Sequence, residues 1–479
     1  MMKNQTPFKI LTAAIFILLI VPVLIKDGMF MDGEFYTVVA KNMANGLGTF
    51  WHPYFSATWC NSGSNICIEQ PPLVWGIQSL FFRTLGNSIY IERLYSFLTA
   101  VITALLIVKF WNSLNANNPK IKQFSWLPVL LWIITPVCFW AYQNNVQENT
   151  MGIFTLSAVF LVFIGLEREK YSYLFFILAG TFVFFASLSK GIPGLFPIAT
   201  LGIYWLVTKN ISFKKMFLGT LIIIATPIII YTLILISSQA ANDGLSFYFF
   251  KRLMGRIEDS HTVTRRGYIL YRIFTEQIPA ILFCVLILLI SKIKKIKIIK
   301  TSKTNSLAIM FFLIGLAGSV PLTLTLVQKG FYFAASLPFF GLGFAFLIAP
   351  QLNEMLSKIN ISDKTLKLLN YFSILVLIGA IGFSAMQYGK KRRDIALLDD
   401  VYTIGKALPK NITVLVEPNL FNEWSLHTGF MHHFNVSIDC NTKNTYSYFI
   451  KDKNSIITIP ANYKKIEIST KKYDLYQIK

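Results

Sequence analysis

Apolar runs long enough to cross a membrane recur along most of this chain, and they constrain its fold more than any other feature. A helix needs about 20 mostly apolar residues to cross the hydrocarbon core of a bilayer, which is ~30 Å thick. Of the 479 residues, 54% are hydrophobic and only 14% are charged, which excludes a water-soluble fold of this length. The sequence therefore predicts a polytopic α-helical membrane protein.

The hydropathy pattern predicts about eleven transmembrane helices. Their expected ranges are 8–26, 89–111, 126–142, 149–166, 171–189, 193–208, 213–237, 276–293, 305–326, 331–349 and 368–388. No small-residue cleavage site follows the first run, so we interpret it as an uncleaved span rather than a signal peptide. Segments 35–44, 71–85 and 244–274 mix apolar residues at helical spacing with polar ones, and we predict amphipathic helices there, at the membrane surface.

The formal net charge of +22 comes mainly from Lys and Arg in short loops between the predicted spans. Anionic headgroups account for such loops, and no basic motif interleaved with aromatics is present, so we expect no nucleic-acid partner. The basic loops share one side if the N-terminus is cytoplasmic. In this orientation the Asp32 loop faces outward. The cluster Lys390–Arg393, after the last predicted span, disagrees with it.

Two of the five cysteines, Cys60 and Cys67, share one polar loop. In an oxidising periplasm this pair favours a local disulfide, and two free thiols or half of a metal site are the alternatives. Cys138 and Cys284 lie inside predicted spans, where we expect them to act as small apolar residues.

The character of the sequence changes after residue 389. A helical run at 395–407 precedes five strand-like runs, at 412–416, 436–438, 446–450, 466–469 and 475–478. We therefore predict two domains: a transmembrane domain over 1–389, and a small soluble α/β domain over 390–479 on the periplasmic side. The second domain carries no catalytic signature.

The stretch Met31–Leu73, after the first span, concentrates residues that carry chemistry. Asp32, Glu34 and Glu69 lie there, at the mouth of a membrane protein, where an ionisable group is costly unless it has a role. A carboxylate in this place is suited to act as a base toward an external acceptor. The alternative for Asp32 is that it caps the N-terminus of the helix that follows.

Several short motifs occur in order among the spans. They are Asp32-Gly33-Glu34-Phe35-Tyr36, Glu69-Gln70-Pro71-Pro72-Leu73, Glu148 at the start of the fourth span, Ser189-Lys190-Gly191-Ile192-Pro193-Gly194-Leu195, His261, and Gln328-Lys329-Gly330-Phe331-Tyr332. The set resembles the polyprenyl-phosphate-sugar-dependent membrane glycosyltransferases, which include lipid A aminoarabinose transferases and protein O-mannosyltransferases. The resemblance implies sugar transfer, among membrane lipids, from a polyprenyl-phosphate donor to a lipid, glycan or protein acceptor. A single displacement predicts inversion at the anomeric carbon.

The resemblance also implies roles for single residues. Asp32 would activate the acceptor hydroxyl, with Glu148 as a second acidic residue of the site. The remaining roles are donor-phosphate binding for Lys190, Lys329 and Arg265, substrate binding for Glu34, Tyr36 and Tyr332, and a divalent metal ion (Zn, Mg or Mn) held by Glu69 and His261. A lysine that snorkels to the interface and a solvated histidine are the alternatives for Lys190 and His261.

Two positions depart from the aminoarabinose-transferase pattern, because Gln70 stands in place of a Lys and Phe35 in place of an Arg. Both bear on the identity of the donor more than on the reaction type. The competing class is a lipid or sugar transporter such as a flippase, although transporters tend to show inverted repeats and broken midplane helices. A non-catalytic lipid-binding scaffold is the third interpretation, and an activity assay separates it from an enzyme.

Overall fold

The computed structural model describes residues 5–58, 67–255, 261–296, 302–358, 362–459 and 461–479. The chain divides into two compact units. The membrane unit comprises Met1–Leu24, Ser96–Gln143 and Gln147–Tyr388, and the α/β unit comprises Ile25–Tyr95, Asn144–Val146 and Gly389–Lys479. The α/β unit thus combines three segments that are far apart in the sequence.

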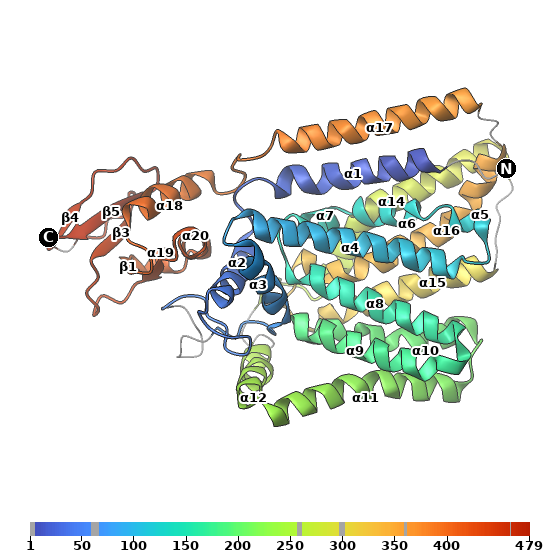
Figure 1. Cartoon of the computed structure of the whole chain (residues 1–479), viewed down its shortest axis with the longest axis horizontal. Helices are drawn as coiled ribbons and strands as arrows, with labels where there is room; N and C mark the ends of the chain where they lie inside the picture. The colour runs from blue at the N-terminus through green and yellow to red at the C-terminus, as the bar shows by residue number, and fades with distance from the viewer. Residues whose placement is uncertain (1–4, 59–66, 256–260, 297–301, 359–361, 460) are drawn as a thin grey trace. The chain divides into compact units, whose positions relative to one another are not determined.

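Nine helices within the described residues are long and apolar enough to cross a membrane, which confirms the predicted polytopic helical fold (Figure 1). The corresponding helices are α1 (Thr6–Leu24), α4 (Tyr90–Leu114), α8 (Gln147–Glu167), α9 (Ser172–Lys190), α11 (Phe213–Ser237), α14 (Tyr268–Ile293), α15 (Ser302–Ala317), α16 (Leu337–Lys358) and α17 (Asp363–Ala385). One bent helix pair would raise the number to ten, so the predicted number of eleven is not confirmed.

The bent pair replaces the straight span predicted at 126–142. Its helices, α6 (Trp126–Ile133) and α7 (Pro136–Tyr142), belong to two segments that meet at 84°. Thr135 lies between them with an extended backbone (ψ 120°). A proline disfavours helical angles in the residue before it, so Pro136 explains the break.

The span predicted at 193–208 is also different. It consists of a 3₁₀ helix, η2 (Ile192–Ala199), and the short helix α10 (Thr200–Thr208). Pro193 and Pro197 have no amide hydrogen to donate, which prevents a regular α-helix over this stretch. Together the two helices cover only Ile192–Thr208, whereas the span that begins with α15 continues through a 3₁₀ helix to Leu324.

The spans of the membrane unit differ in burial. α8 and α16 are the most buried, whereas α11 and α17 expose most of their apolar side chains, as helices that face lipid do. α9 packs against both α8 and α11. At the crossing with α11, a Cβ atom on Gly180 would lie 2.6 Å from the Cβ of Thr226, so this close approach requires glycine.

A five-stranded sheet forms the core of the C-terminal segment in the α/β unit (Figure 1). The strands are β1 (Thr413–Val416), β2 (Ser437–Asp439), β3 (Tyr448–Asp452), β4 (Tyr463–Lys465) and β5 (Tyr473–Ile478), in the order β2-β1-β3-β5-β4. β1 pairs in parallel with β2 and β3, whereas β5 pairs antiparallel with β3 and β4. Helices α18 (Ile395–Ala407), α19 (Pro418–Phe421) and α20 (Trp424–Phe434) share the hydrophobic core of the sheet.

The prediction of this segment is right for α18 and for four of the five strands. The strand expected at 466–469 is wrong. The ladder with β5 covers β4, and one more backbone bond follows it, from Ile466 N–H to the Leu475 carbonyl (2.8 Å). The Ile468 N–H then bonds back to the Ile466 carbonyl, so the chain turns away from the sheet. Helix α20 was not predicted at all.

Two helices of the α/β unit precede the sheet in sequence, α2 (Met31–Ala44) and α3 (Leu73–Leu85), and both were predicted. α3 buries one face, which includes Trp75 and Phe82, as an amphipathic helix does. α2 packs against both α3 and α20 and is buried on nearly all sides, so it is not a surface helix. In the membrane unit, the third predicted amphipathic segment, 244–274, is divided among α12 (Gln239–Ser246), the π-helix η3 (Phe247–Leu253) and the start of α14.

Gly33 of α2 provides a test of this packing. A Cβ atom there would collide with the backbone carbonyl of Asn144, which cannot yield as a side chain would. We expect Gly33→Ala to lower the melting temperature of the purified protein by about 1–3 °C, because overpacking typically costs about 1–3 kcal/mol. Gly382→Ala is the matched control, since a Cβ on this helical glycine meets no atom. Equal melting temperatures for the two variants would contradict the packing.

Candidate active site

Asp32 lies in the first turn of α2 and is half-buried. The N-cap of the helix is Phe30, which has extended backbone angles and makes no side-chain capping bond, so the N-cap alternative for Asp32 is wrong. A negative charge in a first turn is favoured by the positive end of the helix dipole. The candidate base is therefore presented by a packed helix rather than by a loop.

Glu34, two residues later, is buried and holds the segment before Asp32 in place. Its Oε1 accepts a hydrogen bond from the Met29 N–H (3.1 Å), and its Oε2 accepts one from the Thr428 hydroxyl (3.2 Å). Burial raises the pKa of Glu34, and the nearby His432 opposes this effect. With both oxygens engaged inside the unit, Glu34 is placed to position α2 against α20, which differs from the predicted contact with substrate.

Tyr36 is likewise part of the interior. It is 5% exposed and lies in a hydrophobic cluster, 5.8 Å from the Phe35 ring and 6.5 Å from the Trp75 ring between centroids. The Phe35 ring also contacts Phe55 and Trp424. Like Glu34, Tyr36 therefore stabilises α2, and the substrate-binding role predicted for it has no support in this packing.

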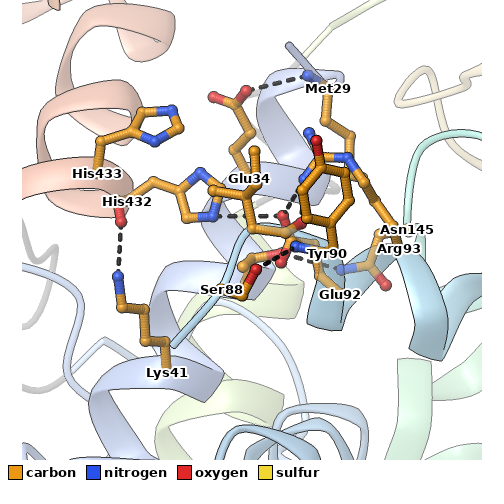
Figure 2. Close-up of polar contacts among 12 residues, drawn as sticks. Met29, Glu34, Lys41, Ser88, Tyr90, Glu92, Arg93, Asn145, His432 and His433 are labelled. Atoms are coloured by element: carbon orange, nitrogen blue, oxygen red, sulfur yellow. Dashed lines mark hydrogen bonds and ion pairs between the residues drawn. The ribbon is translucent and has the colours of Figure 1, made fainter. Parts of the chain in front are cut away.

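A buried network of charges, not predicted from the sequence, lies beside α2 in the same unit (Figure 2). Arg93 Nη1 contacts Glu92 Oε1 (2.6 Å), and Arg93 Nη2 contacts Asp27 Oδ1 (3.3 Å). Asp27 Oδ2 accepts a hydrogen bond from the Tyr402 hydroxyl (2.8 Å), and His432 Nε2 lies 3.4 Å from Glu92 Oε1. The side chains of Glu92 and Arg93 are only 1% and 5% exposed, so the pairing is what makes their burial tolerable.

His433 extends the network, and its tautomer follows from its partners. The Tyr402 hydroxyl has one hydrogen and donates it to Asp27, so its bond with His433 Nδ1 (3.2 Å) must be donated by the ring nitrogen. Burial, reinforced by His432 and Arg93, holds the pKa of His433 well below its usual range. The imidazole is therefore neutral, with its hydrogen on Nδ1.

Basic residues after the last span also belong to this unit. Asp27 and Lys391 form a parallel β-bridge, with bonds from the Asp27 N–H to the Lys390 carbonyl and from the Arg392 N–H to the Asp27 carbonyl (both 2.8 Å). Arg392 Nη2 donates to Asn144 Oδ1 (2.8 Å), and burial lowers its pKa to about 10. Because residues 390–393 share one folded unit with Asp32, they lie on the same side of the membrane as Asp32, and the orientation of that side stays a prediction.

The membrane unit brings together two of the predicted residues, Glu148 and Lys190. Glu148 is in the first turn of α8 and Lys190 is the last residue of α9, and these helices pack against each other. Lys190 Nζ lies 3.3 Å from Glu148 Oε1, and the side chains are 8% and 1% exposed. The ammonium also lies 5.7 Å from the centre of the Tyr332 ring. Glu148 and Lys190 therefore form a buried ion pair beside the Tyr332 ring.

Lys329, Arg265 and His261 lie in two loops of the membrane unit that Gln328 ties together. The Gln328 side chain accepts a bond from the Ile269 N–H (3.0 Å) and donates to the Arg266 carbonyl (2.9 Å). Lys329 is half-buried beside the Phe331 ring, whereas Arg265 and His261 are exposed.

The predicted metal pair is divided between the units, because Glu69 belongs to the α/β unit and His261 to the membrane unit. Among the described residues, no group of three or more His, Cys, Asp or Glu side chains is placed to hold a metal ion. The two-residue site therefore stays a prediction, as does the disulfide, since Cys60 lies outside the described residues.

Comparisons with known proteins follow this geometry. The model of the dolichyl-phosphate-mannose-protein mannosyltransferase family matches residues 69–234, which include Glu148 and Lys190. ArnT from Cupriavidus metallidurans bound to undecaprenyl phosphate aligns with a TM-score of 0.64 at 12% identity, over 97% of this chain and 97% of that chain. Apo ArnT aligns with a TM-score of 0.64 at 11% identity, over 96% and 95%. AglB from Archaeoglobus fulgidus, an archaeal oligosaccharyltransferase in complex with an inhibitory peptide and a dolichol-phosphate, gives 0.52 at 12% identity, over 93% and 69%.

This chain has the fold of ArnT and AglB. The family match and the ArnT-like fold confirm the resemblance that the motifs suggested, and they indicate a membrane glycosyltransferase. A search of curated protein sequences gave no match. The glycosyltransferase fold extends over both units of this chain, including the C-terminal sheet.

The raised pKa of Glu34 predicts a pH dependence of stability. The folded chain keeps a proton on Glu34 at pH values where the unfolded chain has lost it, so stability falls as pH rises from 4.5 through the raised value. Glu34→Gln removes this loss. The melting temperature of the variant relative to wild type should therefore be higher at pH 7.5 than at pH 5, by about 2 °C or more. Glu467→Gln, an exposed position in the same unit, is the control, and an unchanged difference across pH would contradict the assignment.

Proposed function

We propose that this protein is an integral membrane glycosyltransferase that moves a sugar from a polyprenyl-phosphate donor to a lipid, glycan or protein acceptor. The observation that carries the proposal is the placement of Asp32. It lies in the first turn of a helix that is buried on nearly all sides, and buried bonds of Asp27 and Glu34 fix the chain around it. A half-buried carboxylate held so firmly is suited to act on a substrate at one defined position.

The proposed reaction is a single displacement. Asp32 accepts the proton of the acceptor hydroxyl while the hydroxyl oxygen bonds to the anomeric carbon of the donor sugar. The bond from this carbon to the phosphate oxygen breaks, and the polyprenyl phosphate leaves with the bonding electrons. Attack on the face opposite the leaving group inverts the anomeric carbon.

The leaving phosphate gains negative charge, and Lys190 is the cation we assign to it. In the structure Glu148 Oε1 lies 3.3 Å from Lys190 Nζ. The carboxylate compensates the charge of the ammonium, which reduces the free-energy cost of burying it. A donor phosphate would share Lys190 with Glu148. Lys329 and Arg265 would assist, and Tyr332, whose ring lies beside the Lys190 ammonium, would contact the sugar. We place the protein in a bacterial inner membrane with this site on the periplasmic face.

Replacement of Asp32 tests the proposal. Asp32→Asn should lower the rate of sugar transfer by at least about 100-fold, because the base is lost while the shape of the side chain is kept. The assay uses purified protein and a panel of polyprenyl-phosphate sugars, with NMR of the product to assign the anomer. Normal turnover by a folded Asp32→Asn protein, or retention at the anomeric carbon, would refute the mechanism.

Lys190 should affect the donor more than the acceptor. We expect Lys190→Ala to raise the KM for the polyprenyl-phosphate donor at least about 10-fold, and Lys190→Arg to recover part of the loss because it keeps the charge. Lys209→Ala, an exposed lysine of the same unit, is the control. An effect confined to the KM of the acceptor would rule out the phosphate assignment.

A further inference from the structure

A polar pocket of about 670 Å³ opens in the α/β unit, away from the N-terminal turn of α2. We call it the asparagine pocket after the residues that dominate its wall. These are Lys41, Asn45, Asn87, Lys410, Asn411 and Asn435. Its volume lies in the range of about 300–1,000 Å³ that is typical of small-molecule sites. Several lining side chains, such as Asn45, Asn87 and Lys410, are exposed, so the pocket is accessible from solvent.

Four of the five asparagines that line the pocket form two pairs, and the fifth, Asn42, donates to the Tyr54 and Phe55 carbonyls. Asn87 Nδ2 donates to Asn45 Oδ1 (3.2 Å), and Asn435 Nδ2 donates to Asn411 Oδ1. A primary amide has one acceptor oxygen and one NH₂ donor. Each pair therefore has one further NH₂ group and one further oxygen with which to bond a ligand. A sugar hydroxyl both donates and accepts, so neighbouring hydroxyls of a saccharide complement such a pair. The rings of Tyr54 and Phe434 line the same pocket and offer apolar surface for the C–H face of a sugar.

The charge in the pocket is positive. Lys41 Nζ donates to the backbone carbonyl of His432 (2.7 Å). Burial lowers the pKa of Lys41, the Glu92 carboxylate outside the pocket opposes this effect, and the charge of Lys410 adds a smaller lowering. No Asp or Glu is among the described residues that line the pocket. Two ammonium groups that repel each other in a shared pocket attract an anion.

We propose that the asparagine pocket binds an anionic saccharide that forms part of the acceptor. Lys41 follows Asp32 on the same helix, about 14 Å farther along its axis at 1.5 Å per residue. A distal part of a glycan acceptor would occupy the pocket while its reacting hydroxyl lies at Asp32. The assignment to the acceptor rests on the proposed function, whereas the binding of the saccharide does not.

Binding of defined disaccharides to the full-length protein in nanodiscs tests the proposal, with no donor present. The charged probes are digalacturonic acid, which carries carboxylates, and trehalose 6-phosphate, and the neutral counterparts are galactobiose and trehalose. We expect at least one charged probe to bind about 10-fold more tightly than its neutral counterpart, by saturation-transfer NMR titration. The charged probe that binds identifies carboxylate or phosphate as the recognised group.

Two variants locate the binding. Lys410→Ala should weaken the charged probe about 10-fold, whereas Lys406→Ala, an exposed lysine outside the pocket, should not. Asn87→Ala should lower the affinity for the charged and the neutral probes by the same factor, because it removes a group that binds sugar hydroxyls and leaves the lysine charges of the pocket in place. Equal affinity in the Lys410→Ala and Lys406→Ala proteins would overturn the proposal. So would inorganic phosphate that binds as tightly as trehalose 6-phosphate.

The outcomes also separate this inference from the proposed function. Asp32→Asn protein should bind the charged probe with unchanged affinity. Sugar transfer without binding at the asparagine pocket would refute the pocket alone. If the protein binds the charged probe but transfers no sugar from any polyprenyl-phosphate donor, the saccharide site is supported. The assignment of that site to an acceptor is then refuted.

Discussion

Charge that is buried beside apolar helices needs a partner, and the α/β unit is organised around this requirement. Asp27, Glu92 and Arg93 are nearly inaccessible, and an unpaired ion in such a place costs several kcal/mol. The pairs they form with one another are completed by Tyr402 and His432 from α18 and α20. Since Asp27 precedes α2 by a few residues, the same bonds that satisfy these charges also fix the helix that carries Asp32.

The sequence predicts those features that depend on residues close to one another in the chain. Apolar runs identify the membrane helices, because the bilayer accepts little else. α18 is predicted over its full range, and α3 is recognised from the periodic burial that Trp75 and Phe82 confirm. Glu148 and Lys190 were selected separately as site residues, and the packing of α8 on α9 places them 3.3 Å apart.

The features that were missed depend on contacts that no local pattern contains. Thr428, the partner of Glu34, is 394 residues away in sequence, and Tyr402, the partner of Asp27, is 375 residues away. Helix α20 is rich in residues that form helices only moderately well, such as Thr, Gly and His, and its stability comes from packing against α2. A sequence signal did exist for the network, since Asp27 directly follows the first predicted span and the Glu92–Arg93 pair lies in the first turn of α4.

The separation between Glu34 and Thr428 also has a consequence for biosynthesis. While the ribosome is still making the middle of the chain, Glu34 and Asp27 have already emerged, but α18 and α20 do not yet exist. The Asp32 segment must therefore wait, with its acidic residues hydrated, until nearly the whole polypeptide has been made. Closing so long a loop adds only a modest entropic cost, since that cost grows slowly with loop length. The bonds that Asp27 and Glu34 make with α18 and α20 can therefore form only after those two helices have been synthesised.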